Sequence, residues 1–331
     1  MFRQPFFRLF NRACLQVVLV LATTGVGLGQ GYTAPEYDEY LRAVEAGPDA
    51  LIEWYKTHPD STLREYVAPK VNEWAQAQAG EGNYKEAVEI GEKFLGGIDG
   101  EQVEMLKLTT YWAFNSQQWA KATRYGEKVY QAAPETADLL KILAYSYRQL
   151  SDLPKTVEYG EKFCAEASPA DCYSFYPVIA GYYVENKEWA QADSYARKVI
   201  DALETVERPE GMSEEAWSQY VADRRIDAHS IIGKAAYERE DWKTALAAYG
   251  KLLQLSVGDR ERRAEAYFFI GMAHWRLEEF TPAMEALARC TLLEGTTMQK
   301  HCRSQLEVLY RATHNGSLAG LEEFLEDHPP D

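Results

Sequence analysis

The sequence predicts an all-α chain, a right-handed α-solenoid of about six helical hairpins with capping helices at both ends. Three observations predict it. The tripeptide Gly-Glu-Lys occurs at 91–93, 126–128 and 160–162, at intervals of 35 and 34 residues. A large apolar residue precedes each of these glycines by seven positions, and a small residue follows the large one by three. The same pair then recurs without the tripeptide. A period near 34 residues is typical of stacked helical pairs that bury their apolar faces only against neighbouring pairs.

The large residues, which we call anchors, set the register of the repeat. With their small partners they are Tyr84/Ala87, Trp119/Ala122, Leu153/Thr156, Trp189/Ala192, Trp242/Ala245 and Phe280/Ala283. A second small residue lies nine positions before each anchor, at Ala75, Thr110, Ala144, Ala180, Gly233 and Gly271. Small side chains let two helices approach closely. We therefore expect the anchor to begin the second helix of each hairpin and the other small residue to lie in the first.

These positions resemble the tetratricopeptide repeat family over roughly residues 68–294. The family pattern places a small residue at position 8, an aromatic residue near 17, alanine at 20 and often proline at 32, where Pro134 stands here. The chain departs from the pattern at Thr156, and at Pro177, which falls inside a first helix. Because proline is tolerated only in the first turn of a helix, we expect that helix to begin near Tyr173 or Ser174.

Residues 1–29 have the order of a secretory signal peptide, and an uncleaved N-terminal anchor is the alternative. A basic segment without acids precedes an apolar stretch from about Cys14 to Ala22, and small residues follow. The basic residues and the glycines of the expected cleavage site are Arg3, Arg8, Arg12, Gly27 and Gly29. Cleavage before Gln30 would leave a periplasmic or secreted chain. No other stretch approaches the roughly 20 apolar residues of a membrane span.

The charge balance disfavours nucleic acid and anionic lipid as partners. The chain has 35 basic and 51 acidic residues, a net charge of −16. Loss of the three N-terminal arginines leaves 32 basic and 51 acidic residues, a net charge of −19. Nucleic acids and anionic membranes both attract basic surfaces. Recognised catalytic, phosphate-binding and dinucleotide motifs are absent from the sequence. We therefore expect a protein that is not an enzyme and that needs neither a cofactor nor a metal.

Four cysteines remain after the expected cleavage, and they form two close pairs in the sequence. Cys164 and Cys172 are eight residues apart, and Cys290 and Cys302 are twelve apart. Each pair straddles the turn from a second helix to the next helix, where two chain segments come close enough for a disulfide. The spacing predicts bridges 164–172 and 290–302, which suits an exported protein. Four free thiols are the alternative, and a zinc site with His274 and His301 has no recognised spacing.

Three segments lie outside the regular period. Residues 30–67 and 295–331 are predicted to form capping helices, since the end hairpins of a stack need polar outer faces. The interval from Trp189 to Trp242 is about 19 residues longer than one period, and the insertion falls at about 204–222. Ser213 is the expected N-cap of a lengthened first helix that runs to about Glu240 and projects from the stack. A surface insertion without a role is the alternative.

The resemblance implies a concave groove lined by first helices, in which a segment of a partner protein binds. The groove positions lie 12, 8 and 5 residues before each anchor. The predicted groove residues are Lys107, Tyr111, Phe114, Lys141, Tyr145, Arg148, Lys234, Tyr237, Met272 and Trp275. Aromatic rings give contact area at low entropy cost, and lysine or arginine pairs with a carboxylate. The sequence therefore favours a protein or peptide partner with acidic groups.

The predicted function is an exported scaffold or adaptor for protein–protein interaction, with envelope assembly or secretion as the setting that the resemblance suggests. Two alternatives stay open. The chain could self-associate as a structural homo-oligomer, or it could bind glycans as an accessory of a cell-envelope enzyme. The same aromatic rings that suit a peptide also suit a sugar, and packing between adjacent hairpins would use them too.

Overall fold

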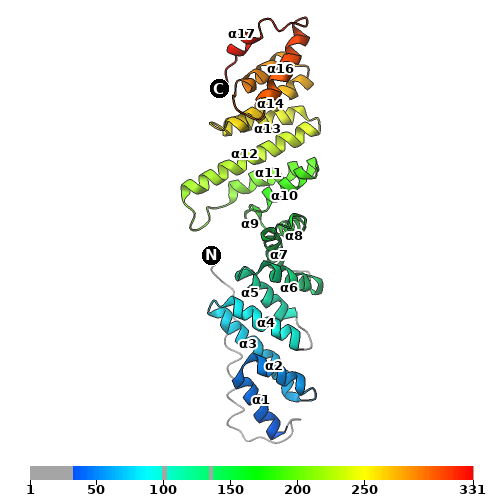
Figure 1. Cartoon of the computed structure of the whole chain (residues 1–331), viewed down its shortest axis with the longest axis vertical. Helices are drawn as coiled ribbons and strands as arrows, with labels where there is room; N and C mark the ends of the chain where they lie inside the picture. Colours follow the sequence, from blue (N-terminus) through cyan, green and yellow to red (C-terminus); the bar gives the residue numbers. More distant parts are fainter. Residues whose placement is uncertain (1–32, 99–102, 134–136, 331) are drawn as a thin grey trace. The chain divides into compact units, whose positions relative to one another are not determined.

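The computed structural model describes residues 33–98, 103–133 and 137–330, and the regular secondary structure of these residues is helical (Figure 1). The predicted signal peptide, residues 1–29, and its cleavage site lie outside the described residues. The described helices pair into hairpins along the chain, so the prediction of an all-α solenoid is confirmed. None of these helices is both long enough and apolar enough to span a membrane.

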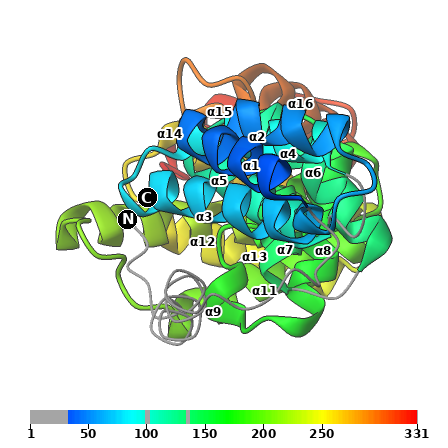
Figure 2. The ribbon, with the colours of Figure 1, turned by 90° about the horizontal axis from the view of Figure 1, so that it is seen from below.

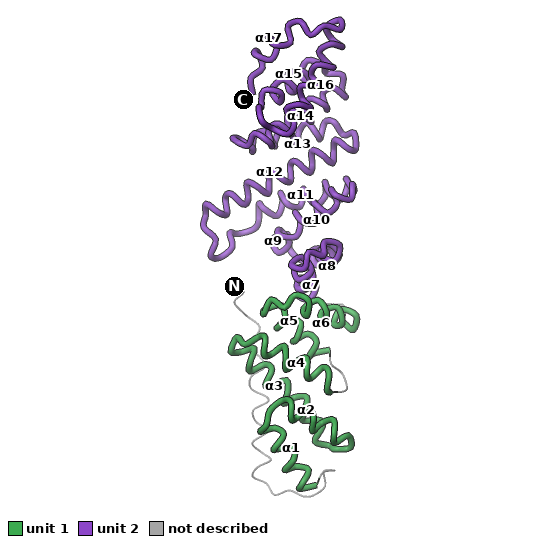
Figure 3. Tube along the Cα trace, viewed as in Figure 1, with its two compact units in different colours: residues 1–133 green, residues 134–331 purple. Residues whose placement is uncertain are grey.

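The chain divides into two compact units, residues 1–133 and residues 134–331 (Figure 3). The helices of unit 1 are α1 (Ala34–Ala46), α2 (Pro48–Thr57), the 3-10 helix η1 (Thr62–Tyr66), α3 (Val67–Gly80), α4 (Tyr84–Gly97), α5 (Val103–Asn115) and α6 (Trp119–Ala132). Those of unit 2 are α7 (Ala137–Gln149), α8 (Leu153–Glu166), α9 (Pro169–Cys172), α10 (Tyr176–Glu185), α11 (Trp189–Thr205), α12 (Glu214–Glu238), α13 (Trp242–Leu255), α14 (Arg260–Arg276), α15 (Phe280–Thr291), α16 (Gln299–Thr313) and α17 (Leu321–Glu326). Within each unit, a helix packs mainly against its neighbours in the chain.

Every predicted anchor is the first residue of a second helix. Tyr84, Trp119 and Leu153 begin α4, α6 and α8, and the other three anchors begin α11, α13 and α15. Two residues before each anchor the backbone adopts a left-handed conformation, at Gly82, Gln117, Ser151, Lys187, Glu240 and Glu278. This residue reverses the chain between the two helices of a hairpin, and only Gly82 adopts the conformation without steric cost.

The small residues of the first helices lie where two helices approach closely. A Cβ atom added to Gly233 of α12 would lie 2.8 Å from the Tyr249 ring of α13. One added to Gly271 of α14 would lie 2.7 Å from Leu287 of α15. Both distances are shorter than ordinary carbon–carbon contacts. The requirement for a small residue is therefore set by the second helix of the same hairpin.

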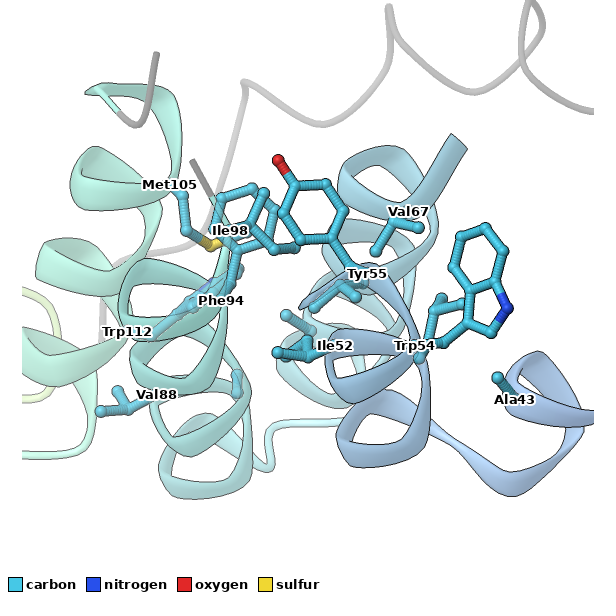
Figure 4. Packing of buried hydrophobic residues seen from close by; sticks show 14 of the residues in the cluster. Ala43, Ile52, Trp54, Tyr55, Val67, Val88, Phe94, Ile98, Met105 and Trp112 are labelled. Carbon is cyan, nitrogen blue, oxygen red and sulfur yellow. The ribbon is translucent and has the colours of Figure 1, made fainter. Parts of the chain in front are cut away.

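The core of unit 1 is a continuous layer of side chains from several helices (Figure 4). Ile52 and Tyr55 of α2, Phe94 of α4 and Trp112 of α5 are all buried in it. Burial of a side chain of this size stabilises the fold by about 1.5–3 kcal/mol. Because α2 contributes Ile52, Trp54 and Tyr55 to this layer, the cap is part of the core of unit 1.

The Gly-Glu-Lys tripeptide fastens one hairpin to the next. A Cβ on Gly91 would overlap the hydroxyl of Thr109 in α5, so glycine lets α4 and α5 approach each other. The Glu92 carboxylate accepts hydrogen bonds from Tyr125 Oη at 2.8 Å and Lys121 Nζ at 2.9 Å, both in α6. In unit 2 the Glu161 carboxylate accepts a hydrogen bond from Tyr183 Oη at 2.6 Å. The motif predicted from its spacing is therefore a contact between hairpins.

These contacts raise the pKa of the tyrosines involved. Burial and the hydrogen bond to Glu92 raise the pKa of Tyr125 to about 12. Burial and the hydrogen bonds to Glu161 raise the pKa of Tyr183 and Tyr195 well above the usual value of 10.0. In each case a neutral phenol donates to a carboxylate, and removal of its proton would bring two negative charges together.

The cysteine pairs lie where the sequence predicts them. Cys164 of α8 and Cys172 of α9 form a disulfide with a Cα–Cα distance of 5.7 Å. Cys290 of α15 and Cys302 of α16 form the other, at 5.8 Å. Both distances are ordinary for a disulfide, and they are consistent with the predicted pairing.

The predicted start of the first helix that contains Pro177 is wrong by two to three residues. α10 begins at Tyr176, not at Tyr173 or Ser174. The cause is the separate helix α9, which ends at Cys172 and continues into a turn in which Phe175 N donates to Cys172 O at 2.8 Å. Pro177 is in the first turn of α10, as its missing N–H requires.

The lengthened first helix is α12, which has 25 residues and begins after Ser213 as predicted. The Ser213 hydroxyl accepts a hydrogen bond from the backbone N–H of Ala216 at 3.1 Å. First helices α5 and α7 begin 16 residues before their anchors, so a regular α12 would begin at 226 and the observed helix begins 12 residues earlier. Figures 1 and 2 show these extra turns extending past the neighbouring helix α13.

Candidate partner-binding surface

The predicted groove residues all lie on first helices, α5 in unit 1 and α7, α12 and α14 in unit 2. The structure separates them into two groups. Lys107, Tyr111, Tyr145 and Arg148 are exposed. Phe114, Lys141, Lys234, Tyr237, Met272 and Trp275 are half-buried. The position of a residue in the repeat therefore selects the correct helix but does not decide whether its side chain faces solvent.

Tyr111 and Tyr145 are the exposed aromatic residues of this set. They occupy the same position, eight residues before the anchor, in successive hairpins. Tyr111 has 42% of its surface exposed and Tyr145 has 39%. Cationic side chains accompany them on the same helices. Lys107 lies 3.8 Å from Glu104 on α5, and Arg148 of α7 donates a hydrogen bond to Ser174 O at 3.3 Å.

The half-buried residues pack within and between hairpins. The Phe114 ring meets Trp119 edge to face at 5.7 Å, and Tyr237 meets both Trp242 and Phe269 at 5.1 Å. Their first role is therefore to join helices. The two lysines of this group lie over aromatic rings, Lys141 Nζ at 5.5 Å from the Phe163 centroid and Lys234 Nζ at 5.9 Å from the Trp189 centroid. Trp275 packs against the C-terminal core.

An aromatic cluster joins the extra turns of α12 to the segment after α9. We call Tyr173, Trp217 and Tyr220 the extension cluster. Trp217 and Tyr220 stack at 5.4 Å, and Tyr173 meets them edge to face at 6.1 and 6.2 Å. Arg224 lies 5.5 Å from the Tyr220 ring centroid. Burial raises the pKa of Tyr220, and Arg224 and Arg148 both act in the opposite direction.

A pocket of about 190 Å³ opens beside this cluster, and we call it the α12 pocket. It is lined by Pro177 of α10, Val199 of α11, Arg224, Asp227, Ala228, Ser230 and Ile231 of α12, and Arg262 of α14. The Asp227 carboxylate lies between two guanidinium groups. Arg262 Nη2 donates to it at 2.6 Å, and Arg224 Nη1 lies 3.4 Å away.

Sequence reasoning identified Ser230 as a groove position but missed the arginines of the α12 pocket. Arg224 lies in the extra turns, where the repeat pattern assigns no role, and Arg262 is far from it in the sequence. The acid–base spacing of Arg224 and Asp227 on one helix face was the signal available. Only the fold shows that Arg262 completes the set.

Metal and catalytic groupings do not appear in the part of the chain that the structure describes. No three metal-binding side chains lie together there. Three histidines end helices instead. His58, His314 and His328 each place Nδ1 within 2.9 Å of the carbonyl oxygen four residues earlier and lie against the aromatic ring of that residue. These histidines satisfy helix C-termini.

No family model and no curated protein sequence matches the chain. Solved structures with similar folds include the C-terminal part of a TPR repeat-containing protein from Cytophaga hutchinsonii. It is 15% identical with a TM-score of 0.40, over 81% of this chain and 97% of that one. A tetratricopeptide repeat protein from Parabacteroides merdae is 14% identical with a TM-score of 0.34, over 83% and 96%. The TPR2AB-domain:pHSP90 complex of yeast Sti1 gives 16% identity and a TM-score of 0.33, over 88% and 94%.

Proposed function

We propose that this protein is an exported interaction scaffold that binds a segment of a partner protein on its first helices. One observation carries the proposal: Tyr111 and Tyr145 repeat at the same register and each leave about two fifths of a large aromatic side chain exposed. Such rings supply much of the binding energy in protein interfaces because they offer a large area and lose little conformational entropy. A residue used only for packing would be covered, as Phe114 and Tyr237 are.

The cationic neighbours of these tyrosines favour a partner segment with acidic groups. Lys107 lies one helical turn from Tyr111, and Arg148 lies one turn from Tyr145. Both are exposed in a chain whose net charge is −16. A carboxylate that reaches either group gains a charge-assisted hydrogen bond, and the surrounding acidic surface disfavours segments placed elsewhere.

The cysteines and the N-terminal segment support the exported setting of the proposal. Disulfides persist in the periplasm and outside the cell and are rare in the cytosol. The cysteine pairs here are joined at ordinary disulfide distances. Residues 1–29 carry the charge and hydropathy order of a signal peptide. We place the protein in the periplasm or outside the cell on these grounds.

The test is crosslinked affinity capture from the host, with the chain lacking residues 1–29 as bait. A Tyr111→Ala/Tyr145→Ala variant is compared with a control variant, Tyr37→Ala/Tyr66→Ala, whose tyrosines expose 37% and 44% of their surface. We expect the first variant to lose the partner, with affinity lowered about 10- to 100-fold. Its helical melting curve should hardly change because exposed substitutions cost within about 0.5 kcal/mol.

Equal capture by all three proteins would contradict binding through these tyrosines. Recovery of the bait chain alone, with a mass that rises with concentration in light scattering, would replace the proposal with self-association. Saturable binding of cell-wall fragments without a protein partner would replace it with glycan binding.

A further inference from the structure

The α12 pocket lies on the side of unit 2 formed by first helices. α10, α12 and α14, the first helices of three successive hairpins, each contribute a lining residue. The pocket is therefore on the kind of surface that the proposed function uses, but none of the ten predicted groove residues lines it.

The floor of the pocket is apolar and is held in place by packing. Val199 is 3% exposed and Ala228 is 2% exposed, and Pro177 and Ile231 complete the apolar lining. A volume of about 190 Å³ is smaller than the roughly 300–1,000 Å³ typical of sites for cofactors and drug-sized ligands. It suits one apolar side chain instead.

The rim of the pocket is rich in hydrogen-bond donors. Each guanidinium carries five N–H donors. Arg262 uses one of them on Asp227 at 2.6 Å, and its Nη1 lies 3.6 Å from Glu265. The Nε of Arg224 is buried without a hydrogen-bond partner. Ser230 Oγ donates to Glu265 at 2.8 Å, which occupies part of that carboxylate. The formal charges of Arg224, Arg262, Asp227 and Glu265 balance, but the donors outnumber the acceptors.

Arg224 belongs to the extra turns of α12 and would be absent from a hairpin of regular length. Its guanidinium is held between the Tyr220 ring, at 5.5 Å, and Asp227, at 3.4 Å. A side chain held in this way loses less entropy when it binds a ligand than a free surface arginine does. The insertion thus adds a preorganised donor to the edge of an apolar pocket.

We propose that the α12 pocket is an anchor site for the partner segment, in which one apolar side chain enters the pocket and a neighbouring Asp or Glu pairs with Arg224 and Arg262. The inference rests on the proposed function and names the chemistry of the segment. Carboxylates match the planar fork of arginine and accept two N–H donors at once. The incoming carboxylate takes donors that Asp227 leaves unused.

The probes are peptides selected from a random 12-residue phage-display library on the chain lacking residues 1–29, then synthesised and titrated by fluorescence anisotropy. We expect them to share an apolar residue next to Asp or Glu. Arg224→Gln/Arg262→Gln should weaken their binding at least 10-fold. Arg276→Gln, an exposed arginine on the same helix as Arg262, should leave it within twofold. Replacing the peptide's acid with its amide should weaken binding to the wild type but not further to the double variant.

Selected peptides without an acid, or peptides that bind the double variant as tightly as the wild type, would overturn the inference. If such peptides still lose binding to Tyr111→Ala/Tyr145→Ala, the proposed function stands and only the pocket is excluded. Failure to select any peptide, together with failure of affinity capture, would overturn both. Should the double variant unfold, Arg224→Gln alone decides, since its side chain lies in the projecting turns and is one third exposed.

Discussion

Two glycines of one hairpin have opposite surroundings. Gly233 of α12 faces the Tyr249 ring, at 2.8 Å from an added Cβ, whereas Gly250 of α13 has no atom within 4 Å of that point. We therefore expect Gly233→Ala to lower the free energy of unfolding by about 1–3 kcal/mol through overpacking against a buried ring. Gly250→Ala should raise it by roughly 0.5–1 kcal/mol because alanine is the better helix former. Urea denaturation followed by circular dichroism measures both. Effects of the same sign would show that helix propensity, not the contact, governs position 233.

The sequence shows the need for a small residue but not the backbone of the turn that follows. Gly233 could be predicted because its size is visible in six copies of the repeat. The left-handed residue two positions before the anchor could not. It is Gln117, Ser151, Lys187, Glu240 or Glu278 in five of the six turns. These residue types carry no turn signal, and the packing of the two helices imposes their conformation at a cost.

At the scale of elements, the contact between Glu92 of α4 and Tyr125 of α6 predicts how stability changes at alkaline pH. The pKa of Tyr125 is raised from 10.0 to about 12 in the folded chain. The unfolded chain therefore releases this proton first as the pH rises. The stabilisation is complete below about pH 10 and is lost progressively between about pH 10 and 12.

Tyr125→Phe removes this contribution. The variant should be less stable than the wild type by about 1 kcal/mol at pH 9, where a hydrogen bond to a carboxylate is lost. The difference should shrink toward zero by pH 12. Urea midpoints measured across this range test the prediction, with Tyr111→Phe as a control for loss of a tyrosine on an exposed ring. A difference that stays constant with pH would mean that the Tyr125 hydroxyl does not bind Glu92.

The order of the helices follows from periodicity, but the position of a binding pocket does not. Ser213 and the length of α12 could be predicted because a cap and an unbroken helical pattern are local signals. The start of α10 was misplaced because α9 is a separate turn of helix tied to α8 by Cys172. The α12 pocket needs Pro177, Arg224 and Arg262 together. Their approach depends on how three hairpins stack, which no local pattern encodes.

At the scale of the whole molecule, the same limit applies to the candidate surface. The repeat register gives the helix face of every predicted groove residue correctly, since all are on first helices. It cannot distinguish Tyr111 from Phe114, because both face the same side and only the neighbouring Trp119 decides which ring is covered. In a stack of hairpins each unit is packed by its neighbours. Exposure is therefore a property of pairs of hairpins and not of one repeat.

The cysteines connect the fold to the compartment in which the whole chain would work. Each bridge joins consecutive helices, α8 to α9 and α15 to α16, across eight and twelve residues. Loops of that length give about 2.5–3 kcal/mol of stabilisation per bridge in the chain-entropy account. We expect non-reducing peptide mapping of the exported protein to show Cys164 joined to Cys172 and Cys290 joined to Cys302. Reduction should lower the urea midpoint, and Cys164→Ser/Cys172→Ser should reproduce only the part due to the first bridge. Free thiols throughout the native protein would contradict both the pairing and the proposed export, since the geometry lets the bridges form wherever the environment is oxidising.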